Sequence, residues 1–303
     1  MTYREAYETW LKEFADDRAT VDELKAIAGD EKEIEDRFYT ELSFGTAGMR
    51  GVLGAGTNRM NLYNVRRATK GFADYINSQN PEYRRRGVVI AYDSRRMSPE
   101  FAKASALVLC HEGIHVYLFD ELRPVPILSY AVRHLHAIAG IVITASHNPP
   151  QYNGYKVYWE DGAQMPPEYA DQVLARIRAN RYEDAVEMDE AEAKAKGLLQ
   201  IIGSKEVDDD YIAQVKTLSV QPELMKTAGK ALKLVKRTIE RPGVIAPLNS
   251  DKNGTFGLRC CGNEGKLGHQ AASMRCKISS TTSSTVYSSI SNHTIRSSRL
   301  NHE

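Results

Sequence analysis

Apolar positions along the chain follow two alternating periods, which predict an α/β fold. Short β-branched runs predict buried strands at 88–92, 114–119 and 138–143. Apolar residues at helical spacing predict helices at 62–76, 98–110 and 127–136. Strand–helix–strand units of this size make parallel sheets, so we expect a three-layer α/β/α domain.

The amino-terminal residues have a helical pattern of their own. Tyr7, Trp10, Leu11 and Phe14 recur at helical spacing, and a second short helix is predicted at 31–38. Such aromatic stripes usually pack into a core. We therefore predict a helical arm at 1–40.

The apolar pattern weakens towards the carboxyl terminus. Residues 180–200 are charged and rich in alanine, which predicts a connector, and a helix at 207–218 and a strand beginning at 231 follow. From 236 the periodicity stops, and residues 278–303 are rich in serine and threonine. That composition cannot bury a core, so disorder is expected there.

Composition narrows the function classes. A net charge of +1 gives no reason to expect a nucleic-acid partner. The sequence also has no run of 18 apolar residues, which is about the length that a membrane-spanning helix needs. The amino terminus lacks the apolar segment of a signal peptide, so we expect a cytoplasmic protein. Three of the four cysteines lie beyond residue 259, at a spacing typical of no zinc site.

The most informative chemistry follows the strand at 138–143. The sequence Thr144-Ala-Ser-His-Asn-Pro149 predicts a loop at the carboxyl end of that strand, where open α/β sheets bind ligands. Asn153-Gly154 is typical of a two-residue hairpin, which would return Lys156 to the loop. A hydroxyl, an imidazole and an ammonium group would then converge at Ser146, His147 and Lys156.

Three interpretations of Ser146 are open. The hydroxyl could cap its own turn, or serve with His147 as a hydrolase nucleophile. Neighbours in a loop rarely reach nucleophile–base geometry, however, and no Gly-x-Ser-x-Gly motif surrounds this serine. Phosphoryl transfer instead needs a nucleophile, a proton carrier and positive charge, which these side chains could supply.

A second motif could add a phosphate contact. Phe44-Gly-Thr-Ala-Gly-Met-Arg-Gly51 combines glycines that permit close backbone approach with the guanidinium of Arg50. By itself it fits a glycine-rich turn with a solvated arginine equally well.

Three motifs in order resemble the phosphohexomutases, the phosphoglucomutase and phosphomannomutase family. They are the glycine-rich motif at 44–51, Tyr92-Asp-Ser-Arg95, and the serine loop with Asn153-Gly-Tyr-Lys156. The resemblance covers about residues 1 to 235. It implies a mixed, mostly parallel sheet in a first domain at 41–200, and the start of an incomplete second domain at 201–235.

The resemblance also implies roles for single residues. Ser146 would carry a phosphoryl group and offer its oxygen to Mg²⁺, while Lys156 and His147 would assist proton transfer. Arg50, Asn148 and Thr46 would bind the substrate, and Asp93 and Arg95 would only hold the loop. The implied reaction interconverts glucose 1-phosphate and glucose 6-phosphate through a hexose bisphosphate.

The chain departs from the family pattern in two places. It contains neither the Asp-x-Asp-x-Asp-Arg string that binds Mg²⁺ nor an Arg-x-Ser-Gly-Thr phosphate loop, and Asp208-Asp-Asp210 predicts only a helix start. We therefore expect no turnover, and a non-catalytic sugar-phosphate-binding or inert fragment is the alternative. Since the resemblance stops abruptly, residues 236–303 are predicted to be an aberrant or frameshifted tail.

Overall fold

The computed structural model describes residues 1–45, 48–220, 248–250 and 256–258. It divides into one unit at 1–244 and another at 245–303. In the second unit, β7 (Leu248–Ser250) pairs antiparallel with β8 (Phe256–Leu258). The predicted strand at 231 lies outside the described residues. So does the predicted tail at 236–303, apart from β7 and β8.

A six-stranded sheet forms the centre of the first unit, in the order β1-β5-β4-β2-β3-β6. The strands are β1 (Met49–Val52), β2 (Val88–Tyr92), β3 (Val116–Phe119), β4 (Ala139–Ile143), β5 (Tyr152–Trp159) and β6 (Leu199–Ile202). The pairs β4–β2, β2–β3 and β3–β6 are parallel, whereas β5 is antiparallel to both β4 and β1. The prediction of a mixed, mostly parallel sheet is confirmed.

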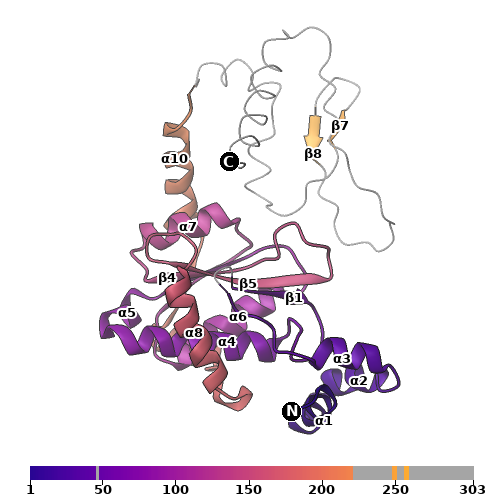
Figure 1. Cartoon of the computed structure of the whole chain (residues 1–303). Helices are drawn as coiled ribbons and strands as arrows, with labels where there is room; N and C mark the ends of the chain where they lie inside the picture. The colour runs from indigo at the N-terminus through magenta and orange to yellow at the C-terminus, as the bar shows by residue number, and fades with distance from the viewer. Residues whose placement is uncertain (46–47, 221–247, 251–255, 259–303) are drawn as a thin grey trace, which may run out of the picture. The chain divides into compact units, whose positions relative to one another are not determined.

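Helices cover both faces of this sheet (Figure 1). On one face lie α4 (Leu62–Gln79), α6 (Ser98–His111) and α8 (Pro167–Ala179), and on the other lies α7 (Val125–His134). Two shorter helices, α5 (Pro81–Arg86) and α9 (Glu190–Ala195), join these elements. The three-layer α/β/α architecture is therefore confirmed.

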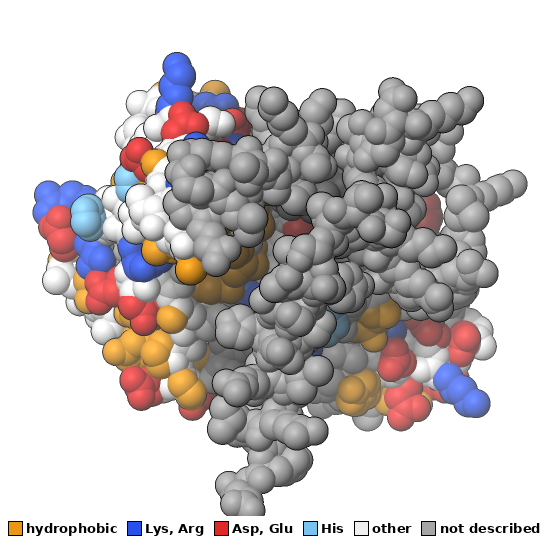
Figure 2. All heavy atoms as spheres, turned by 90° about the horizontal axis from the view of Figure 1, so that it is seen from above, with side chains coloured by type: hydrophobic (Ala, Val, Ile, Leu, Met, Phe, Trp, Pro, Cys, Tyr) orange, Lys and Arg blue, Asp and Glu red, His pale blue; other side chains and the backbone are white. Residues whose placement is uncertain are grey.

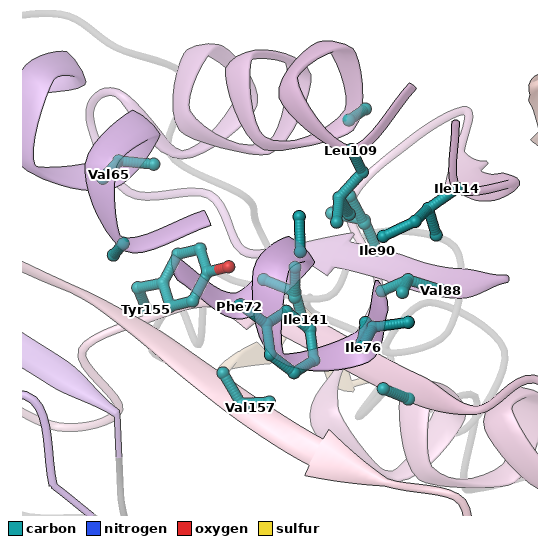
Figure 3. Packing of buried hydrophobic residues seen from close by; sticks show 14 of the residues in the cluster. Val65, Phe72, Ile76, Val88, Ile90, Leu109, Ile114, Ile141, Tyr155 and Val157 are labelled. Carbon is teal, nitrogen blue, oxygen red and sulfur yellow. The ribbon is translucent and has the colours of Figure 1, made fainter. Parts of the chain in front are cut away.

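The larger apolar core lies between the sheet and the α4 layer (Figure 3). Phe72 and Ile76 of α4 pack with Ile141 and Tyr155 of the central strands, and all four are fully buried. The Tyr155 hydroxyl accepts a hydrogen bond from Thr69 at 3.2 Å, which satisfies the polar tip of an otherwise apolar side chain. Burial raises the pKa of Tyr155, so this hydroxyl stays neutral.

A smaller core lies beneath α7, where Ile127 and Leu128 pack with Val142 and Tyr158 of the sheet. Successive side chains of a strand point to opposite faces. Lys156 lies between two residues of the larger core, so it belongs to the α7 face.

Three helices make up the amino-terminal arm: α1 (Tyr3–Glu13), α2 (Arg18–Ala26) and α3 (Glu31–Phe38). Trp10 is 2% exposed and makes edge-to-face contacts with Phe14 and Phe38 of the arm, and with Tyr63 and Tyr182 of the domain. Burying these rings holds the arm against the domain. The sequence pattern predicted α1 and α3 but not α2.

The connector predicted at 180–200 was wrong. The segment contains a short 3₁₀ turn at Tyr182–Asp184, the helix α9, and the first half of the edge strand β6. Only Leu199 and Ile202 of this short strand are buried, and it directly follows a charged, alanine-rich segment in the sequence. A π-helical turn, η2 (Ser204–Asp208), and α10 (Asp209–Thr217) follow it.

The visible surface of the described residues carries mixed charge. In Figure 2, the Lys and Arg side chains are interspersed with those of Asp and Glu. Among the helices of the described ranges, none has both the length and the hydropathy that crossing a bilayer requires. A cytoplasmic location and the absence of a nucleic-acid partner stay predictions.

Candidate active site

The loop after β4 presents Ser146 to solvent, as predicted. Its backbone is left-handed, with φ of 58°, which is uncommon for a residue with a side chain. The Ser146 amide donates to Thr144 Oγ1 at 3.0 Å, and the Asn148 amide donates to the Ala145 carbonyl at 3.1 Å. These local bonds make a compact turn that lifts Ser146 out of the sheet.

The hairpin predicted at Asn153-Gly154 was wrong. Both residues lie inside β5, neither has positive φ, and residues 144–151 make the turn instead. Gly154 allows β5 to pass close to the start of the serine loop, because a Cβ there would lie 2.6 Å from the Thr144 carbonyl oxygen. Asn153 is fully buried, and its amide bonds to the turn before α6.

Lys156 still returns towards the loop, because β5 runs antiparallel to β4. It pairs with Val142 in the strand register, and its side chain is partly buried. Gly48 lies directly against this point, since a Cβ there would fall 2.9 Å from Lys156 Cα. Within the described part of the chain, the Lys156 ammonium has no hydrogen bond or ion pair, so its charge stays available to an anion.

His147 reaches the hydroxyl next to it. Its Nδ1 lies 3.3 Å from Ser146 Oγ, so these two loop neighbours are in contact. The left-handed backbone of Ser146 is the local feature that accompanies this contact. Whether Nδ1 donates or accepts depends on the tautomer of the ring.

Arg50 joins the loop from a distant part of the chain. In β1 it pairs with Gly154 of β5, and its Nη1 donates to Asn148 Oδ1 at 3.0 Å. The side chain is otherwise exposed, which leaves most of its donors free for an anion. Thr46, the other predicted substrate contact in this motif, lies outside the described residues.

Arg95 organises the backbone of the serine loop. Its Nη2 donates to the carbonyls of Ser146 at 2.9 Å and Asn148 at 2.7 Å. Its Nη1 donates to the carbonyls of Pro149 at 3.0 Å and Tyr152 at 3.1 Å. The structure thus agrees with the sequence-based expectation that Arg95 holds this loop by hydrogen bonds.

The family resemblance led us to expect Mg²⁺, with Ser146 as a ligand. In the described ranges, no three His, Cys, Asp or Glu side chains come together as a metal site. The Ser146 hydroxyl is one neutral oxygen, whereas Mg²⁺ prefers six oxygen ligands that include carboxylates. The described residues therefore do not fit Mg²⁺. Asp208, the nearest candidate in the sequence, instead turns inward to Arg123.

Comparison with known proteins finds a family match for part of the chain. Residues 41–184 match the family model described as phosphoglucomutase/phosphomannomutase, alpha/beta/alpha domain I. Residues 41–184 are therefore similar to the first domain of this mutase family.

Several known proteins are similar to part of this chain. A phosphoglucomutase of Staphylococcus epidermidis is 42% identical over 189 residues, which are 62% of this chain and 34% of that protein. A phosphopentomutase of Mus musculus is 44% identical over 143 residues, which are 45% of this chain and 23% of that protein. A solved phosphoglucomutase/phosphomannomutase family protein from Burkholderia thailandensis is 24% identical, with a TM-score of 0.45 over 57% of this chain and 35% of that chain.

The chain thus spans about a third or less of the length of these relatives. The predicted first domain at 41–200 begins where the family match begins, and its end at 200 stays a prediction.

Proposed function

We propose that Ser146 accepts a phosphoryl group from a hexose bisphosphate and returns one to a hexose monophosphate. In this way the mutase would interconvert glucose 1-phosphate and glucose 6-phosphate. The observation that carries the proposal is the exposed Ser146 hydroxyl beside His147 Nδ1, on a loop at the carboxyl end of β4.

The transfer step would use Ser146 and His147 of the loop together with Lys156 of β5. Ser146 Oγ would attack phosphorus and form the new Oγ–P bond, while the bond from phosphorus to the sugar oxygen breaks. His147 Nδ1, 3.3 Å from the hydroxyl, would accept its proton in the tautomer with a free lone pair. The Lys156 ammonium would donate a proton to the departing sugar oxygen.

Positive charge supports the assignment to phosphate chemistry. The transferred group carries negative charge on its equatorial oxygens, and fixed cations stabilise it. Arg50 approaches the loop through Asn148 and keeps most of its guanidinium exposed, so it would orient the substrate phosphate. Thr46 is proposed to contribute from the same motif.

A second candidate function is single phosphate acceptance or binding without turnover. It is favoured because the described residues contain no set of carboxylates that fits Mg²⁺. We expect the polypeptide 1–303 by itself to take up phosphate without sustained formation of glucose 6-phosphate.

A coupled assay distinguishes the two candidates. It follows glucose 6-phosphate formation from glucose 1-phosphate, with glucose 1,6-bisphosphate and Mg²⁺ present, in the wild type and in Ser146→Ala. Sustained turnover that disappears in Ser146→Ala would establish mutase activity and refute the expectation of no turnover. Turnover that survives in Ser146→Ala would overturn the nucleophile assignment.

A further inference from the structure

Asn153 is a fully buried amide on β5 whose polar atoms are all engaged. Its Nδ2 donates to the Arg96 carbonyl at 2.9 Å and to Ser98 Oγ at 3.0 Å, while its Oδ1 accepts from the Gly154 amide at 2.7 Å. A buried polar group that loses a partner has a large desolvation penalty. The orientation of this amide is therefore strongly determined.

Ser98 transmits that orientation to Asp93. Its hydroxyl accepts from Asn153, so its single proton is directed to Asp93 Oδ1, 2.8 Å away. Asp93 Oδ1 also accepts the Arg95 amide at 2.9 Å, and Asp93 Oδ2 lies 3.5 Å from Arg95 Nε. An unbroken polar chain thus runs from β5, through the first residue of α6, to the Arg95 side chain.

Arg95 is the last member of this chain and contacts the loop directly. Its guanidinium binds the Ser146 carbonyl and three further carbonyls that follow it. Ser146 has a left-handed backbone, which a residue with a side chain keeps only where its surroundings hold it. The direction of Ser146 Oγ therefore depends on where the guanidinium lies.

We propose that Asn153 is a positioning residue: through Ser98 and Asp93 it orients the Arg95 guanidinium that holds Ser146 in its left-handed conformation. The proposal rests on the proposed function, because the atom being positioned is the phosphoryl acceptor. Asn153 itself would touch neither the sugar nor the phosphate.

Asn64 supplies a matched control. It is also a buried asparagine, and its Nδ2 donates to the carbonyls of Gly56, Thr57 and Arg59. None of its hydrogen bonds reaches the serine loop. Asn64→Ala should therefore reproduce the general loss of stability in Asn153→Ala without changing the position of Ser146.

The test measures the single-turnover rate constant for phosphorylation of Ser146 in the full chain, with glucose 1,6-bisphosphate and Mg²⁺, below the melting temperature of each variant. Misplacing a reacting atom by about 1 Å can slow a reaction roughly 100-fold, so we expect a loss of about that size in Asn153→Ala. The concentration of bisphosphate at half-saturation should change by less than about threefold, since no substrate contact is removed. Asn64→Ala should keep the wild-type rate constant.

Two further measurements separate positioning from other causes. Arg95→Lys should slow the phosphorylation of Ser146. Adding Asn153→Ala to it should change the rate constant by less than about twofold, because both substitutions interrupt the same series of polar contacts. In addition, amide exchange in residues 144–152 should accelerate in Asn153→Ala and Arg95→Lys but not in Asn64→Ala.

Several results would overturn the proposal. They are a wild-type rate constant in Asn153→Ala, an equal loss of rate constant in Asn64→Ala, or fully additive effects of Asn153→Ala and Arg95→Lys on the rate constant. If the wild type takes up no phosphate, the proposed function falls and amide exchange alone decides the positioning role. Unchanged exchange in Asn153→Ala would then refute that role.

Discussion

Two arginines follow neighbouring parallel strands, but their partners differ. One is paired with carboxylates, whereas the other is bound mainly to the carbonyls of the serine loop. Arg123 follows β3 and is 8% exposed, with Nε bonded to both oxygens of Asp208 at 3.1 and 2.9 Å and Nη2 bonded to Asp120 at 3.1 Å. Arg95 follows β2, and its guanidinium donates to four neutral carbonyls, with one carboxylate oxygen 3.5 Å away.

Charge compensation explains the difference in role. Two carboxylates surround Arg123, so it anchors the turn before α10 and leaves no net positive charge there. Burial raises the pKa of Asp208, and the nearby Arg123 acts in the opposite direction by favouring the carboxylate. The guanidinium of Arg95 is bound mainly to carbonyls, so positive potential remains at the serine loop, where a phosphoryl group would arrive.

The largest effect on stability is expected at the compensated arginine. Arg123→Met leaves Asp208 buried without its partner, and breaking a buried pair in this way costs about 3–5 kcal/mol. Arg95→Met removes hydrogen bonds from a partly exposed loop and should cost about 1–2 kcal/mol. Urea unfolding of both variants measures the two losses.

A double variant sharpens this comparison. Adding Asp208→Leu to Arg123→Met removes the unpaired carboxyl, so the double variant should be more stable than Arg123→Met alone. Equal losses for Arg95→Met and Arg123→Met, or no recovery in the double variant, would show that the two sites do not differ as described.

An intermediate effect is expected where β5 passes the serine loop. In Gly154→Ala the new methyl group would lie 2.6 Å from the Thr144 carbonyl oxygen, so the strands must separate, at about 1–3 kcal/mol. Gly29→Ala is the control, because a Cβ there meets nothing within 4 Å. Thermal unfolding of both variants measures the difference, and a neutral Gly154→Ala would refute the close approach that we describe.

The smallest effect concerns His115, just before β3 at the opposite end of the sheet from both arginines. Burial lowers the pKa of His115 below its usual 6.5, and its Nδ1 is buried without a hydrogen-bond partner among the described residues. The unfolded chain binds a proton there more readily, so stability should fall as the pH drops below about 6.5.

His115→Phe tests this pH dependence, since it keeps a ring against Tyr117, whose centroid lies 4.4 Å away. The fall in unfolding free energy between pH 7.5 and pH 5.5 should be shallower in His115→Phe than in the wild type. Parallel curves for the two proteins would show that His115 does not contribute.

The position of a strand in the sheet decided whether its sequence revealed it. The strands β2 and β4 are buried along their length, so their β-branched runs were visible without knowledge of the fold. The edge strand β6 was missed: it has only four residues, two of which face solvent, and it directly follows a charged, alanine-rich segment. Local composition therefore identifies central strands better than edge strands.

The site was predicted to the extent that its signals are local. Ser146 and His147 are neighbours, and the antiparallel return of β5 was anticipated through an incorrect hairpin. The pairing of Arg123 with Asp208 joins residues 85 positions apart, and the bond between Arg50 and Asn148 joins residues 98 positions apart. Neither pair has a periodic pattern that could reveal it. The buried role of Asn153 was hidden because an Asn-Gly pair usually marks a turn.

The most direct test of the account is to locate phosphate on the chain. The full chain is incubated with glucose 1,6-bisphosphate and Mg²⁺, digested, and analysed by mass spectrometry beside Ser146→Ala and the control Asn64→Ala. We predict one phosphate, on Ser146, in the wild type and in Asn64→Ala, and none in Ser146→Ala. Phosphate on another serine, or an unmodified wild-type chain after prolonged incubation, would contradict it.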